Sequence, residues 1–535
     1  MTEGEQGQGA PAEDFEESRP KSGQMESIYY SVVSRATPDG CIMIGQDIEI
    51  FPTKELPELS CLGARAFEAK DRRSPAEQYA LLCEGTSVPR VMMLGSYRGM
   101  KNTHIVRLVT AGIINWTPEN AQRFVLILEK PQGKKIIAAP GAAPLKVSDE
   151  RLVEAIIQPA LSVLMDFRNI DCVHGAINLE NAFLVGPAGS EEIVLGECIS
   201  ASAFSRQHAI YESLGRATAQ PSGRGVGTIK DDLYALGVCV AMIARGENLA
   251  ANMSQNQVVT EKIKHGSYGV IAGRDRMPGA ITEFLRGVLT DDEEGRWGIE
   301  EVLSWIEGRR LSPKQSRPAQ KAARPLVFCE EKYFDLRLLA EAFSQNIVEA
   351  GKEIDKGQLE MWLKRNFDDG PLKVRIGTYL EKEKTSTREK GVFNACMAID
   401  PAGPLRFKGV SIFPAGYGTA LAEAVIKGDD IQVYAEMVMQ GLLTTWLTQN
   451  FDHTVDAAGL TSTFERCRNF LTQRMPGYGV ERILYTLNPE LPCMSPALSG
   501  YHVLAPGSIL LALEGVSKQA GKATVILDRH MIAFI

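Results

Sequence analysis

Apolar residues recur at helical spacing in several stretches of this chain, and these stretches predict its helices. A first stripe on one helix face consists of Leu152, Ile156, Ala160, Leu161 and Leu164. Ser148 precedes this stripe and is followed by Asp149 and Glu150, which suits an N-cap and a first turn that the helix dipole favours. The apolar run Ala182–Val185 suits a strand.

The second half of the chain is predicted to be mostly helical. Two further apolar stripes are Leu336, Leu339, Ala342, Phe343 and Ile347, and then Leu359, Trp362, Leu363 and Phe367. Residues 431–447 and 461–471 are also helix-like and are separated by turns rich in Gly, Pro and Asp. We therefore expect a mainly α-helical C-terminal domain over residues 327–535.

Composition and charge narrow the class of protein. A chain of 535 residues has room for roughly two to four domains. Its net charge of −8 provides no basic field, so nucleic acid is not an expected partner. No stretch of about 18 apolar residues occurs, so no transmembrane segment is predicted.

The cysteines and the N-terminus favour a cytoplasmic protein. Ten cysteines are scattered without a C-x-x-C pair, which indicates buried, reduced thiols and not a disulfide framework or a zinc site. Residues 1–26 are acidic and rich in Glu, Gly, Pro, Ser and Gln, and they predict a disordered tail without the pattern of a signal peptide.

One short motif carries candidate chemistry. His174-Gly175-Ala176-Ile177-Asn178-Leu179-Glu180-Asn181 resembles the catalytic loop H-R-D-L-K-x-x-N of protein kinases. In that family the Asp accepts the proton of the substrate hydroxyl, and the Asn holds a metal ion. Ala176 stands in place of the Asp and Asn178 in place of the Lys, whereas His174 and Asn181 keep the family's spacing.

The flanking segments extend the resemblance over residues 45–307. The run from Asp231 through Asp232 to Gly237 resembles the start of the large helix of the kinase C-lobe, and Arg296 precedes a last helix as it does in that family. Upstream, residues 64–74 resemble the second strand and turn of bacterial Ser/Thr kinases. The resemblance implies an α+β, two-lobe protein-kinase-like fold, with the N-lobe and hinge at 27–147 and the helical C-lobe at 148–307.

The resemblance also implies that the catalytic groups are missing. The positions of the ATP-anchoring Lys, of its Glu partner, of the catalytic Asp, of the phosphate-contacting Lys and of the metal-binding Asp fall on Leu82, Met93, Ala176, Asn178 and Gly196. The glycine loop falls on Leu59, Cys61 and Ala64, none of which is glycine. The hinge falls on Leu128, Glu129 and Lys130.

The retained residues also have structural interpretations. His174 suits a packed core histidine, and Asn181 suits a bridge between backbone groups. Asp232 and Gly237 are expected to act structurally. Arg296 is expected to anchor the fold without the family's Glu partner, because that partner's motif falls on Gln220-Pro221-Ser222.

Residues 308–326 form a basic, Pro-containing stretch. It is predicted to be a solvated linker between the kinase-like region and the C-terminal domain. Binding of an acidic partner there is the alternative.

Two functions remain in competition. The first is a pseudokinase without catalytic residues or a cofactor, which acts as a scaffold or allosteric regulator through an unidentified protein partner. The alternative is a nucleotide-binding sensor or an unorthodox Ser/Thr protein kinase, in which Asn181 and Glu197 would hold ATP and Mg²⁺.

Overall fold

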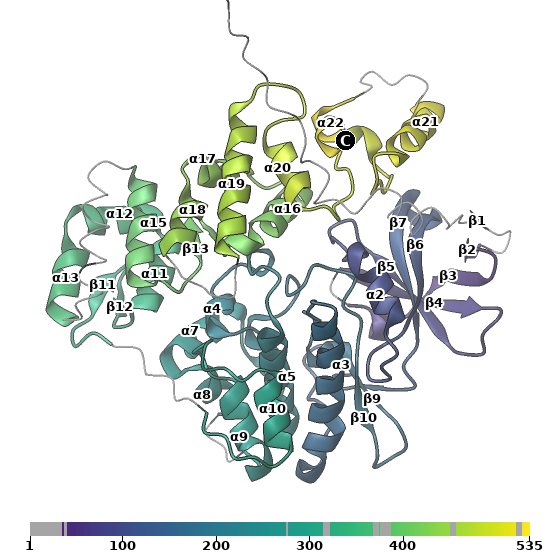
Figure 1. Ribbon diagram of the computed structural model, residues 1–535, viewed down its shortest axis with the longest axis horizontal. Helices are drawn as coiled ribbons and strands as arrows, with labels where there is room; N and C mark the ends of the chain where they lie inside the picture. Colours follow the sequence, from purple (N-terminus) through teal and green to yellow (C-terminus); the bar gives the residue numbers. More distant parts are fainter. Residues whose placement is uncertain are drawn as a thin grey trace, which may run out of the picture.

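The computed structural model describes residues 35–36, 40–61, 63–273, 277–313, 321–367, 374, 387–449, 456–520 and 527–535. The predicted tail at 1–26 and residues 314–320 of the predicted linker lie outside the described residues. The expected α+β class is confirmed, since an N-terminal sheet region is followed by helices, and the C-terminal region is mostly helical (Figure 1).

An antiparallel sheet with the order β1-β2-β3-β4-β5-β7-β6 forms the N-terminal region. Its strands are β1 (Arg35–Ala36), β2 (Ile42–Ile44), β3 (Ile48–Glu55), β4 (Ala64–Asp71), β5 (Gln78–Cys83), β6 (Leu108–Trp116) and β7 (Ala121–Glu129). Both faces are apolar: Phe67 and Trp116 belong to the core on one face, and Leu81 and Phe124 to the core shared with the helices on the other. This two-sided burial explains why β5 is a continuous buried run.

A short connection between β5 and β6 packs on the inner face of the sheet. It comprises a 3-10 turn at Val91–Met93 and the helix α2 (Leu94–Gly99). A smaller sheet with the order β10-β9-β8 follows, from β8 (Gly133–Lys135), β9 (Ala182–Val185) and β10 (Glu192–Leu195). An isolated parallel β-bridge between Ile105, which precedes β6, and Leu195 at the end of β10 connects the smaller sheet to the large one.

The helical region lies below the sheet in Figure 1. Its helices are α3 (Gln158–Asn169), α4 (Leu214–Ala217), α5 (Ile229–Arg245), α6 (Leu249–Asn252), α7 (Gln255–His265), α8 (Ser267–Ile271), α9 (Gly279–Val288) and α10 (Ile299–Ile306). The helix predicted from Ser148 begins with a 3-10 turn and a π-helical turn at Val153–Ile157 before α3. The Ser148 side chain makes no capping hydrogen bond.

Helix α5 is the centre of this region. Its residues Asp231–Ile243 are all buried. Thr228 and Asp231 form a capping box at its start, and Gly246, with φ of 66°, ends it in the left-handed conformation.

The C-terminal region has a hydrophobic core of its own. Its elements are β11 (Leu326–Phe328), β12 (Glu331–Tyr333), α11 (Leu336–Gln345), α12 (Ile347–Asp355), α13 (Gln358–Asn366), α15 (Arg388–Ile399), β13 (Leu405–Phe407), β14 (Val410–Ile412), α16 (Tyr417–Lys427), α17 (Gln432–Met439), α18 (Leu442–Gln449), α19 (Ala457–Thr472), α20 (Val480–Leu487), α21 (Ser508–Ala520) and α22 (Arg529–Phe534). The helix predicted over residues 431–447 is divided into α17 and α18 at Gly441, whose φ is 66°. Ala322 is already buried in this core.

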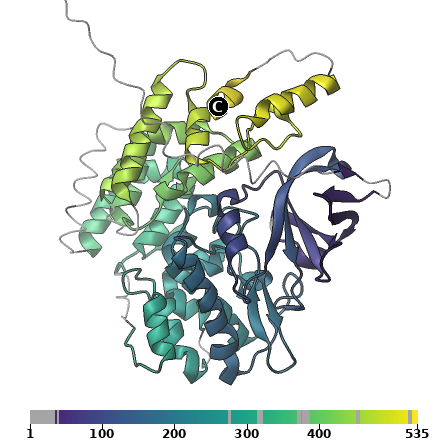
Figure 2. The ribbon, with the colours of Figure 1, turned by 45° about the vertical axis from the view of Figure 1, so that its right-hand side comes forward.

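The C-terminal region contacts both other parts of the protein. It arches from the helical region to a position above the sheet, where α21 and α22 lie (Figures 1 and 2). Gln122 N on β7 donates to Gly500 O at 2.7 Å, and Gln220 N in the helical region donates to Ser411 O at 2.9 Å. Leu504 is buried in the hydrophobic core that the sheet region shares with the helical region.

Two predictions from composition can be compared with the fold. Cys83, Cys198, Cys239, Cys396, Cys467 and Cys493 are buried free thiols. Over the described ranges, no helix combines the length and the apolarity that a membrane span requires.

Candidate functional site

A cleft of about 100 Å³ lies between the large sheet and the helical region. Its walls are Ser60 and Cys61 before β4, Lys135 on β8, and parts of two loops, 175–181 and 197–207. The structure therefore brings together five of the predicted positions, which are Cys61, Ala176, Asn178, Asn181 and Glu197.

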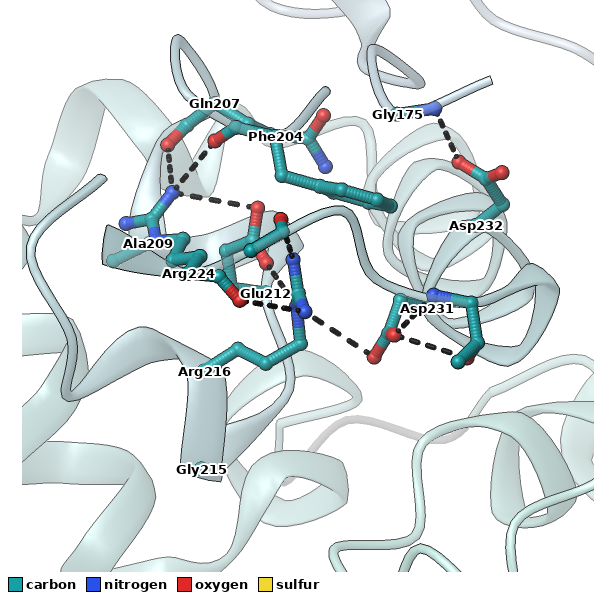
Figure 3. Close-up of polar contacts among 12 residues, drawn as sticks. Gly175, Phe204, Gln207, Ala209, Glu212, Gly215, Arg216, Arg224, Asp231 and Asp232 are labelled. Carbon is teal, nitrogen blue, oxygen red and sulfur yellow. Dashed lines mark hydrogen bonds and ion pairs between the residues drawn. The ribbon is translucent and has the colours of Figure 1, made fainter. Parts of the chain in front are cut away.

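Asp232 on helix α5 holds the start of the first loop, at residues 174 and 175, in place. Both oxygens of this buried carboxyl accept backbone N–H groups at 2.8 Å, one from His174 and one from Gly175. Figure 3 shows the contact with Gly175. Burial raises the pKa of Asp232 to about 7, against the opposing effect of these two N–H donors. Gly175 has a φ of 68°, and a Cβ there would lie 2.6 Å from Ala203 Cβ, so this turn requires glycine.

His174 is a buried structural residue. Its Nδ1 accepts from Ala176 N at 3.2 Å, which leaves Nε2 to donate to Gly196 O at 3.2 Å. Its ring packs edge-on against Phe167. Burial lowers the pKa of His174 to about 3, so the ring is neutral and serves to hold the loop.

Asn181 bridges two backbone segments with its amide. Its Nδ2 donates to Ala176 O at 3.0 Å and to Glu197 O at 2.8 Å. The side-chain oxygen lies against Gly196, because a Cβ at position 196 would be 1.9 Å from Asn181 Oδ1. This close approach leaves no room for a carboxylate at position 196.

The carboxylate of Glu197 is occupied by its own loop. Its Oε2 accepts from Ile199 N at 2.7 Å and from Ser200 N at 2.8 Å, and its Oε1 accepts from the Ser200 hydroxyl and from Cys61 Sγ. Burial and the nearby Glu197 raise the pKa of the Cys61 thiol. In the part of the chain that the structure describes, no three His, Cys, Asp or Glu side chains gather as a metal site would require.

Ala176 and Asn178 provide no reactive group. Ala176 has only a methyl side chain at the cleft, and Asn178 caps the 3-10 turn Leu179–Asn181 by accepting from Glu180 N at 3.0 Å. The loop thus consists of polar side chains that satisfy the loop itself.

The predicted positions on the sheet do not belong to the cleft walls. Leu82 is buried in the core on the opposite face of the sheet, whereas its neighbours Leu81 and Cys83 face the helices. Position 82, where the resemblance places the ATP-anchoring Lys, therefore faces away from the cleft, because successive side chains of a strand alternate between faces. Met93 is buried in the 3-10 turn before α2.

The predicted hinge positions connect the two sheets. Leu128 is buried, Glu129 Oε1 accepts from Arg107 Nη1 at 3.1 Å, and Lys130 N donates to Glu77 O at 2.9 Å. The chain then enters β8, which places Lys135 at the cleft.

Gly237 and Arg296 stabilise the helical region. A Cβ on Gly237 would lie 2.5 Å from Val288 Cγ2, so glycine allows α5 to approach α9. Arg296 is buried and pairs with Asp231 at 3.4 Å, while its Nε donates to Thr290 O at 3.0 Å. Arg296, which was expected to lack the family's Glu partner, thus has Asp231 as its carboxylate partner.

A buried charge cluster beside Asp231 was missed by the sequence analysis. Glu212 pairs with Arg216 at 3.1 Å and with Arg224 at 3.3 Å (Figure 3). Lys262 lies fully buried near it and donates to three carbonyl oxygens, those of Ala209, Ile210 and Glu212. No sequence signal marks this cluster, because its members come from separate loops and helices.

The sequence analysis also did not identify three residues that line the cleft or hold its loops, namely Arg90, Lys135 and Gln207. Arg90 donates to Val173 O, His174 O and Cys198 O, and so holds both cleft loops. Its acceptors are backbone carbonyls 83 to 108 residues away along the chain, which carry no sequence signal. Burial lowers the pKa of the Lys135 ammonium at the cleft.

No model of a protein family matches this chain, and no curated protein matches it either.

Proposed function

We propose that this protein is a kinase-like pseudokinase that acts as a scaffold or regulator through protein–protein contacts. The observation that carries the proposal is the closed hydrogen-bond network of the cleft loops. The Asn181 amide is used by two backbone carbonyls, and Gly196 lies too close to Asn181 for any larger side chain.

The order of the elements supports the kinase-like part of the proposal. A twisted antiparallel sheet, a connection at residues 128–130 and a helical region around α5 follow one another as the resemblance implies. The cleft between them is where such a fold would bind nucleotide. Its volume of about 100 Å³ is well below the roughly 300–1,000 Å³ of ligand pockets.

The cleft chemistry supports the loss of catalysis. Phosphoryl transfer needs positioned carboxylates and cations around the phosphates, and a single acid or base group typically contributes about 10²–10⁴ in rate. Glu197 is the carboxylate nearest to the expected metal position, and its oxygens already accept four hydrogen bonds. Leu81 and Cys83, which face the helices from β5, offer no cation.

The C-terminal region supports a scaffolding role in the cytoplasm. It contacts the sheet region and the helical region at once, and so it presents a combined surface to a protein partner. The buried free thiols suit a reducing compartment.

Thermal unfolding with ATP, with and without Mg²⁺, tests the proposal. A ligand at a hundred times its Kd stabilises the folded state by about 2.7 kcal/mol, which gives a clear rise in Tm. We expect no rise at millimolar ATP. A Mg²⁺-dependent rise that Glu197→Ala abolishes would instead establish the nucleotide-binding alternative.

A further inference from the structure

Gln207 is a buried amide whose hydrogen bonds are not made by the described part of the protein. It is 4% exposed and lines the cleft, yet neither its Oε1 nor its Nε2 has a partner among the described residues. Figure 3 shows this amide pointing away from the Arg224 guanidinium, whose one contact with Gln207 is to the backbone oxygen. A buried polar group without a hydrogen-bond partner destabilises the folded state, so this amide calls for a partner that the described residues do not supply.

Two cations lie on the walls of the same cleft. Lys135 Nζ donates to Glu58 O at 3.0 Å and to Ser60 O at 3.5 Å, which leaves one of the three ammonium protons. Arg206 Nη2 donates to Thr86 O at 2.6 Å, and the other guanidinium donors remain available. Within the described ranges, neither cation forms an ion pair with a carboxylate.

Among the described residues, neither carboxylate that lines the cleft, Glu180 or Glu197, accepts a hydrogen bond from these donors. Glu197 accepts four hydrogen bonds from its own loop and from Cys61. Glu180 is exposed at the cleft rim. Unused donors on Lys135, Arg206 and Gln207 Nε2 therefore outnumber the unused acceptors, which are Gln207 Oε1 and the exposed Glu180 carboxylate.

The unused donors and acceptors of the cleft indicate the chemical class of its ligand. A molecule that satisfies it carries several acceptor oxygens and at least one hydroxyl donor, and the cleft volume of about 100 Å³ limits it to a few heavy atoms. We infer that the cleft binds a small hydroxylated oxyanion, held by Lys135 and Arg206 and oriented by Gln207. The shared chemistry is that of hydrogen phosphate and of a short hydroxycarboxylate.

Isothermal titration calorimetry on the full chain tests the inference. Inorganic phosphate and glycolate are titrated separately, with acetate and sodium chloride at matched ionic strength as references. We expect saturable binding of phosphate or of glycolate, and the one that binds more tightly identifies the source of the oxyanion. The references are expected to bind at least tenfold more weakly.

Three variants locate the site. Lys135→Ala and Arg206→Gln are each expected to weaken binding at least tenfold, whereas Lys134→Ala, which removes the exposed neighbouring lysine on β8, leaves it unchanged. Gln207→Leu is expected to weaken binding while leaving the Tm without ligand equal or higher, because it removes an unsatisfied buried amide. A merely structural Gln207 would lower the Tm and leave binding intact.

Some results would overturn the inference. Absence of saturable binding for both oxyanions is one, and equal binding by Lys134→Ala and Lys135→Ala is another. The inference is independent of the proposed function, because ATP with Mg²⁺ tests the latter separately. If neither oxyanion binds and ATP with Mg²⁺ also gives no rise in Tm, this inference fails and the proposed function stands.

Discussion

At the scale of single residues, the cleft loops are held in place by three polar side chains that contact the loops themselves. His174 is neutral because of burial, Asn181 bridges backbone carbonyls, and Asp232 accepts two backbone N–H groups. Each of these side chains makes contacts whose loss would destabilise the loop, so their retention needs no catalytic explanation.

Gly196→Ala tests the close approach of Asn181 to this loop. The added Cβ would lie 1.9 Å from Asn181 Oδ1, so we expect a loss of about 1–3 kcal/mol in the free energy of unfolding. Urea denaturation measures it, and Gly85→Ala, where no atom lies within 4 Å, serves as the control. The cost should be less than additive with Asn181→Ser, and strict additivity would show that another contact causes it.

The pH dependence of stability tests the neutral state of His174. Its pKa is about 3 in the folded state and near 6.5 in the unfolded chain, so the unfolded state takes up a proton first as the pH falls. The free energy of unfolding therefore falls between about pH 6.5 and 3, and His174 accounts for about 2 kcal/mol of this loss by pH 5.

His174→Asn should remove that share of the pH dependence. Urea denaturation at pH 7.5 and pH 5 measures it for both proteins, and the other histidines cancel in the comparison. An unaltered pH dependence in His174→Asn would mean that the ring is protonated in the folded state.

At the scale of elements, patterning predicted the type of most segments and missed details set by tertiary contacts. Most of the predicted stripe that begins at Leu336 lies in α11, and most of the stripe that begins at Leu359 lies in α13. Ile347 instead begins α12, and Phe367 follows the end of α13. The stretch 431–447 was predicted to be continuous, but Gly441 divides it, because helical spacing on both sides masks a single left-handed residue. The sequence could not show which face of the sheet Leu82 occupies. All residues of β5 are buried, so polar and apolar side chains do not alternate along this strand.

Gly237→Ala tests the packing of α5 against α9. The new methyl would lie 2.5 Å from Val288 Cγ2 inside the core, so the higher helix propensity of Ala is outweighed and we expect a loss of about 1–3 kcal/mol. Thermal or urea unfolding measures it. Gly279→Ala at the start of α9, where no atom lies within 4 Å, should be neutral or stabilising. Equal effects at both sites would exclude close packing as the cause.

At the scale of the whole molecule, the division at residues 308–326 does not separate independent parts. Phe413 N donates to Gly223 O at 2.8 Å, and Glu490 Oε1 accepts from Met92 N at 2.8 Å, so the C-terminal region holds the helical region and the sheet region together. The sequence could not predict these contacts, because most of them join backbone groups far apart in the chain. Arg90 extends them to the cleft loops.

Co-expression of residues 1–313 with residues 321–535 tests whether these contacts suffice without the linker. We expect the fragments to co-elute as a one-to-one complex, because each fragment has its own core and the interface joins both. Gly416→Val should separate them, since a Cβ at position 416 would lie 2.3 Å from Gly223 O and 2.7 Å from Gly225 N, and backbone atoms cannot move away cheaply. Gly85→Val, in open space, should leave the complex intact. If the unaltered fragments elute separately, the covalent linker holds the parts together, and the C-terminal region is then an independent module and not a clamp on the cleft.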